Sequence, residues 1–109
     1  MKTKKLSIPI FYGELIIVKY KDYKEVNKKF NQNISKRYDA VVFQDESVNH
    51  TKLIAAFHGK PSNNVIAHEC VHLVNHIFIN NKMGLDPYND EPQAYLTGWS
   101  SKQIENFFK

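Results

Sequence analysis

The sequence predicts one small α+β domain over residues 1–109, in which a small mixed β-sheet packs on a long central helix that is followed by C-terminal helices. Short segments rich in β-branched and aromatic residues fill the first half of the chain. A helical stretch of about 20 residues follows, with apolar residues almost all round it. A chain of 109 residues, 42% of them hydrophobic, has the size and composition of one hydrophobic core.

The chain opens with a predicted hairpin and a short helix. Residues 7–12 and 14–20 read as two strands, because Gly13 between them can adopt the positive φ that a tight turn requires. Residues 22–31 carry a helical apolar stripe, with Asp22 in position to cap the first turn. We therefore expect two antiparallel strands followed by a first helix.

The middle of the chain supplies two more strands and the central helix. Residues 40–44 and 51–58 are predicted strands, joined by a polar connection over residues 45–50. Ser62 can cap a helix that runs to about residue 81. Because its apolar residues lie on nearly every side, we expect this helix to be the buried centre of the molecule.

The C-terminal part is predicted to be helical. A turn over residues 86–90 precedes a helix that begins at Glu91, with Asp90 as its N-cap. Gly98 is expected to interrupt that helix, and the capping-box pattern over residues 100–103 predicts a short closing helix. The two C-terminal helices would then close the domain.

Charge and hydropathy exclude several classes of protein. The net charge is +4, and residues 1–37 hold ten Lys or Arg against three Asp or Glu. We interpret Lys21, Lys24 and Lys28 as the solvated side of helix 22–31, so nucleic-acid binding is not expected. The sequence contains no apolar run of membrane-spanning length and no signal-like core after its basic start, which predicts a cytoplasmic protein that does not enter membranes.

The central helix carries the pattern H-E-x-x-H, formed by His68, Glu69 and His72. Histidines four residues apart lie one turn apart on one helix face, where both can bind one Zn²⁺. The glutamate beside them can act as general base towards a water that the metal activates. Cys70, the single cysteine, falls about 200° around the helix from His68, so we interpret it as a small core residue and not a ligand.

The run from Val65 to Val74, together with Glu91 downstream, resembles the signature of the zincin metallopeptidases in their gluzincin branch. It is similar to small phage and bacterial zincin-like proteins and, more loosely, to ImmA/IrrE-type peptidases. The resemblance implies a minimal zincin-like domain, a zinc cofactor and a peptide or protein substrate. It also implies that the strand before the motif helix, Thr51 to His58, is an edge strand to which the substrate adds as an extra strand. An interior strand is the alternative for that segment.

The motif histidines need a third protein ligand, since a hydrolytic zinc site keeps its fourth position open. Glu91 is the candidate favoured by the resemblance and by its place at the start of the next helix. Asp90 is adjacent, but its expected task is to cap that helix. His76 is a weaker candidate, because about 12 Å of helix rise separates it from His68.

A peptidase also needs a donor that stabilises the developing oxyanion. Tyr95 lies one turn after Glu91 and is the first choice, with Tyr88 and His58 behind it. The sequence thus predicts a zinc-dependent peptidase with Glu69 as general base. The alternative is a noncatalytic zinc-binding or protein-interaction module on the same fold.

Overall fold

A computed structural model describes residues 1–45 and 51–109, so the predicted connection over residues 45–50 lies largely outside the described residues. Within them, four strands form one mixed sheet and three helices pack on it, which confirms the predicted α+β class. The elements in chain order are β1 (Lys2–Ser7), β2 (Glu14–Tyr20), α1 (Tyr23–Phe30), β3 (Ala40–Asp45), β4 (Lys52–His58), α2 (Asn63–Asn80) and α3 (Glu91–Phe107).

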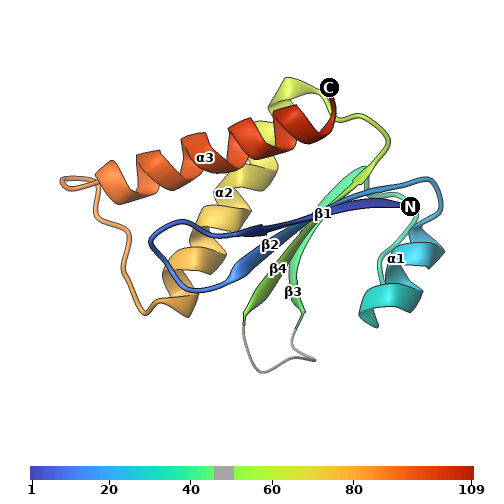
Figure 1. Cartoon of the computed structure of the whole chain (residues 1–109), viewed down its shortest axis with the longest axis horizontal. Helices are drawn as coiled ribbons and strands as arrows, with labels where there is room; N and C mark the ends of the chain where they lie inside the picture. The colour runs from blue at the N-terminus through green and yellow to red at the C-terminus, as the bar shows by residue number, and fades with distance from the viewer. Residues whose placement is uncertain (46–50) are drawn as a thin grey trace.

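The sheet has the strand order β1-β2-β4-β3. β1 pairs antiparallel with β2, and β3 pairs antiparallel with β4, whereas the central strands β2 and β4 run parallel. Figure 1 shows α1 on one side of the sheet and α2 and α3 on the other, with α3 crossing α2. The domain therefore has three layers, with the sheet in the middle.

Each face of the sheet builds its own hydrophobic core, because side chains alternate between the two faces of a strand. On the α2 and α3 side the sheet contributes Leu15, Ile17, Leu53, Ala55 and Phe57. On the α1 side it contributes Val18, Tyr20, Ile54 and Ala56. The central strands are buried on both faces, which explains their nearly continuous apolar sequence.

The first strand is displaced from its predicted position. β1 spans Lys2–Ser7, while all but the first residue of the strand predicted over residues 7–12 lies in the connection to β2. Pro9 has no amide hydrogen to donate to a ladder, and Ile10 has a φ of 68°. The lysine-rich segment before it pairs instead, since lysines are well tolerated on an edge strand.

The first helix confirms its prediction closely. The Asp22 side chain accepts a hydrogen bond from the Lys24 amide at 3.0 Å, which caps α1. Asn31 adopts a left-handed conformation with a φ of 53° and ends the helix.

The C-terminal helix differs from the prediction, because α3 is continuous from Glu91 to Phe107 and passes through Gly98. Ser100 is fully buried within it, so residues 100–103 do not form a capping box. Leu96, Ile104 and Phe107 join the core on α2, and this packing outweighs the weak helix propensity of one glycine. Asp90 occupies the N-cap position but makes no side-chain capping bond.

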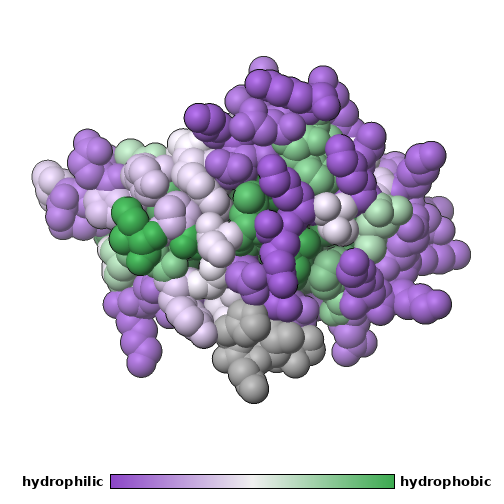
Figure 2. Space-filling model, viewed as in Figure 1, coloured by the Kyte–Doolittle hydropathy of each residue, from purple (hydrophilic) through white to green (hydrophobic). Residues whose placement is uncertain are grey.

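The surface reflects this layering. Figure 2 shows hydrophilic residues over most of the visible surface of α1 and α3, with a hydrophobic patch at the end where the β1–β2 connection lies. Among the described residues, none of the helices combines the length and apolar character needed to cross a membrane.

Two glycine substitutions test this fold in opposite directions. Gly13 has a φ of +125°, and an added Cβ would lie 3.2 Å from the Thr51 carbonyl oxygen and 3.3 Å from Ile8 Cδ1. We expect Gly13→Ala to lower the free energy of unfolding by about 1–3 kcal/mol. Gly98→Ala meets no neighbouring atom within 4 Å and should raise it by about 0.5–1 kcal/mol, as in any helix interior.

Urea unfolding of both variants beside the parent protein measures these changes. Destabilisation by Gly98→Ala would contradict a continuous α3.

Candidate metal centre

One side of the motif helix α2 packs against the sheet and α3, and its other side is exposed to solvent. Its buried residues are Ile66, Glu69, Cys70, Leu73, Val74, Ile77 and Phe78. His68 and His72 lie on the opposite, exposed side, together with Val71, which is 55% exposed. The expectation that this helix is enclosed on all sides is therefore wrong: the sheet and α3 cover only one side of it. The same arrangement leaves both motif histidines accessible.

The imidazoles of His68 and His72 face each other across one helical turn. Their Nε2 atoms are 3.2 Å apart, and the ring centroids are 4.9 Å apart. Without metal this contact is a hydrogen bond in which one neutral ring donates to the other. Two imidazole nitrogens on one tetrahedral Zn²⁺, each about 2.0–2.1 Å from the ion, are also separated by about 3.3 Å. The pair thus has the spacing that two zinc ligands require.

Glu69 lies between the two histidines in sequence but is buried, with 6% of its surface exposed. Its Oε2 atom has no hydrogen-bond partner among the described residues. Burial raises the pKa of Glu69, while His72 and His68 oppose that rise. A buried carboxylate oxygen without a partner is costly, so it fits a position that a bound cation or water completes.

The side of α2 that carries Glu69 can be placed relative to the sheet. Phe78 contacts Phe11 of the β1–β2 connection, with ring centroids 6.5 Å apart. Glu69 precedes Phe78 by nine residues, which places it about 180° around the helix. Glu69 therefore lies on the opposite side of α2 from Phe78, and β3 is an outer strand of the sheet that contacts α2.

The strand order contradicts the expectation that the substrate adds to an edge strand at Thr51 to His58. β4 pairs with β2 on one side and with β3 on the other, so Thr51 to His58 is not an edge strand. The segment is the interior alternative, as its five consecutive buried residues from Leu53 to Phe57 also show. The outer strand on this side of the sheet is β3.

The third ligand is not assembled with the histidine pair. Within residues 1–45 and 51–109, no three His, Cys, Asp or Glu side chains form a group that could hold a metal ion. Glu91 is exposed in the first turn of α3, and Asp90 is exposed beside it. His76 is half-buried one turn beyond His72, and burial followed by the charge of His72 lowers its pKa. The histidine pair and Glu69 fit a zinc site, and the identity of the third ligand stays a prediction.

The three candidate oxyanion donors lie in different places. Tyr95 is on α3 and is 48% exposed, whereas Tyr88 is 99% exposed in the turn before that helix. His58 is on the α1 side of the sheet, since it continues the alternation of Ile54 and Ala56. The sheet separates His58 from α2, so it is no longer a candidate, and Tyr95 stays the first choice.

Comparison with protein-family models, with curated proteins and with solved structures gave no match.

Cys70 is fully buried on α2, near Glu105 of α3, and gives a test of the packing between the two helices. Burial, with the carboxylates of Glu69 and Glu105, raises its pKa to about 11. We expect thiol reagents at neutral pH to label Cys70 slowly in the folded protein and rapidly in urea, because the thiolate is the reactive form. Fast labelling of the folded protein would show that the contact between α2 and α3 opens readily.

Proposed function

We propose that the protein is a zinc-dependent peptidase whose centre is built on α2. The observation that carries this proposal is the pair of facing Nε2 atoms on His68 and His72, 3.2 Å apart, beside the buried and unpartnered carboxylate oxygen of Glu69. Buried carboxylates without a hydrogen-bond partner are rare, and they occur mainly where the carboxylate binds a cation or takes part in catalysis.

In this proposal each residue has a separate task. His68 and His72 would hold the zinc ion through Nε2, with Glu91 of α3 as the proposed third ligand. When bound, the ion would supply a Lewis acid for the attacking water and the scissile carbonyl group. Glu69 accepts the proton of the attacking water and passes it to the leaving amine. Tyr95 donates a hydrogen bond to the developing oxyanion.

The substrate in this proposal is an extended or flexible peptide segment. β3 is an outer strand of the sheet and contacts α2, so such a segment would pair along the outer edge of β3. The open side of α2 would then lie along the bound peptide.

The second candidate is a noncatalytic zinc-binding or protein-interaction module. The lack of a third ligand near His68 and His72 among the described residues favours it. The burial of Glu69 favours the peptidase, because two or three ligands alone would hold a structural ion without any buried base.

Zinc binding tests the centre directly. We expect about one Zn²⁺ per chain after reconstitution, and His68→Ala or His72→Ala should each weaken binding about tenfold or more, since each removes a ligand. His58→Ala is the matched control, because this exposed histidine lies on the other side of the sheet. Isothermal titration with Zn²⁺ measures all three variants. Equal affinity in the His68, His72 and parent proteins would remove the basis of the proposal.

The same titration identifies the third ligand. Glu91→Ala should weaken zinc binding by about tenfold or more, whereas His76→Ala should leave it nearly unchanged. His76 is one turn further along α2 than His72, about 6 Å along the helix axis, and leads away from the shared ion. Loss of zinc in His76→Ala with retention in Glu91→Ala would place the third ligand on α2 itself.

Glu69→Gln separates the two candidate functions. We expect this variant to keep its zinc and to lose turnover of a labelled, unfolded protein substrate by about a hundredfold or more, because a general base is worth that much. Metal-free Glu69→Gln should also unfold at a higher urea concentration than the parent protein, since a neutral amide is cheaper to bury than a carboxylate. Undiminished hydrolysis would show that Glu69 is not the base.

A further inference from the structure

The carboxyl ends of β2 and β4 form a crevice on the opposite side of the sheet from the motif histidines. These strands are parallel neighbours, and their last residues, Tyr20 and His58, are paired. From β2 the chain turns to α1 on one face, and from β4 it turns to α2 on the other (Figure 1). In open α/β sheets, ligands bind in the crevice where the connections of neighbouring parallel strands diverge in this way.

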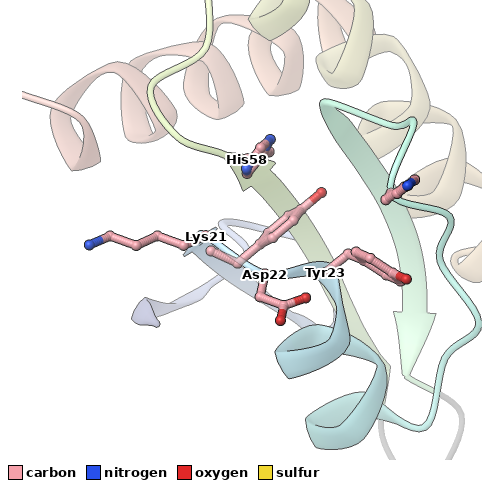
Figure 3. A pocket seen from close by; sticks show the side chains of 6 residues that line it. Lys21, Asp22, Tyr23 and His58 are labelled. Atoms are coloured by element: carbon pink, nitrogen blue, oxygen red, sulfur yellow. The ribbon is translucent and has the colours of Figure 1, made fainter.

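A cavity of about 240 Å³ occupies this crevice. It is lined by Tyr20, Lys21, Asp22, Tyr23, Lys36 and His58. Figure 3 shows His58 at the end of β4 and Lys21, Asp22 and Tyr23 on the segment that leads from β2 into α1. The lining therefore comes from the ends of both parallel strands and from the segment before β3.

The His58 ring is stacked on a neighbouring ring, and its nitrogens make no hydrogen bond among the described residues. It stacks on Tyr20, with centroids 5.5 Å apart and 21° between the ring planes. The Tyr20 hydroxyl donates to the Tyr38 carbonyl at 3.2 Å, and the His58 amide donates to the Asp39 carbonyl at 2.8 Å. A preorganised ring with uncommitted nitrogens can donate to a ligand with little loss of entropy.

The side chains that line the cavity carry one more positive than negative charge. Among the described residues, neither Lys21 nor Lys36 has an ion-pair partner, and both are exposed. The carboxylate of Asp22 already accepts from the Lys24 amide as the cap of α1. The lining thus holds two ammonium groups against one carboxylate, with the His58 imidazole beside them.

We propose that this crevice binds a phosphate group carried by a small molecule. A phosphate monoester carries about 1.5–2 negative charges at neutral pH; Lys21 and Lys36 can each donate to one of its oxygens, and His58 can donate to a third. A second cavity of about 400 Å³ shares Tyr20 and Lys21 and is otherwise lined by Met1, Lys2, Lys19 and Glu25. The phosphate occupies the first cavity, and the remainder of the molecule extends towards the second. The site is independent of zinc, since the sheet lies between the two.

The test is a titration of the full chain, freed of metal with a chelator, with inorganic phosphate and separately with adenosine monophosphate. Calorimetry gives the affinities, and amide NMR shifts locate the binding. Lys21→Gln combined with Lys36→Gln should weaken binding of either probe about tenfold or more. Lys102→Gln is the matched control, an exposed lysine on α3 that lines neither cavity, and should change the affinity by less than about twofold.

Saturable binding with shifts confined to residues 20–23, 36 and 58–59 supports the proposal. Tighter binding of adenosine monophosphate than of inorganic phosphate shows that the second cavity holds the rest of the ligand. The proposal is overturned if neither probe saturates, or if Lys102→Gln weakens binding as much as the double variant. Binding of a single-stranded oligonucleotide with no response to either small probe also overturns it, because the surface would then recognise a polymer.

Discussion

β2 and β4 pair in parallel from Glu14↔Lys52 to Tyr20↔His58, and parallel neighbours cannot be joined by a tight turn. The chain between them must cross the sheet, which it does through α1 and β3. After β4 it leaves on the opposite face and enters α2. Both candidate sites depend on this pairing: it sets the motif helix on one face of the sheet, and it opens the crevice at Tyr20 and His58 on the other.

The second constraint is the one-sided packing of α2. Buried carboxylates cost several kcal/mol when nothing compensates them, and Glu69 is buried in an otherwise apolar helix face. The pKa of Glu69 is raised because burial disfavours its charged form, and the nearby His72 and His68 partly oppose that rise. A cation held by His68 and His72 would reduce it further, so metal binding and folding would be coupled through this residue. The fold thus carries a destabilising group at the position where the proposed hydrolytic centre would need a base.

Local patterns predicted much of the fold. The cap at Asp22 and the stripe of α1 are decided within about three turns of chain, and the structure has both. The prediction of secondary structure was wrong where tertiary contacts determine whether a segment is a helix or a strand. Gly98 was expected to break a helix, but Leu96 and Ile104 pack on α2 and hold α3 together. β1 was misplaced because its lysines hide the strand signal at a sheet edge.

The candidate metal centre also has one part that local sequence predicts and one part that depends on tertiary packing. Helical periodicity alone places His68 and His72 on one face, and the structure shows their Nε2 atoms meeting there. The relation of Glu91 to that face depends on how α3 docks, which the sequence does not encode locally.

His58 shows how strand alternation and strand order act together. Its position just before the motif helix suggested a role beside that helix, yet Phe57 faces α2, and the next residue on a strand must face the other way. Leu53, Ala55 and Phe57 lie on one face of the strand, and Ile54 and Ala56 lie on the other. Because both faces are apolar, the alternation does not indicate which face packs against which helix. Only the strand order, with α1 on one face and α2 on the other, decides which set meets which helix. The same order brings His58 beside Tyr20 from the end of β2, 38 residues earlier in the chain, and thereby creates a crevice that no local pattern could indicate.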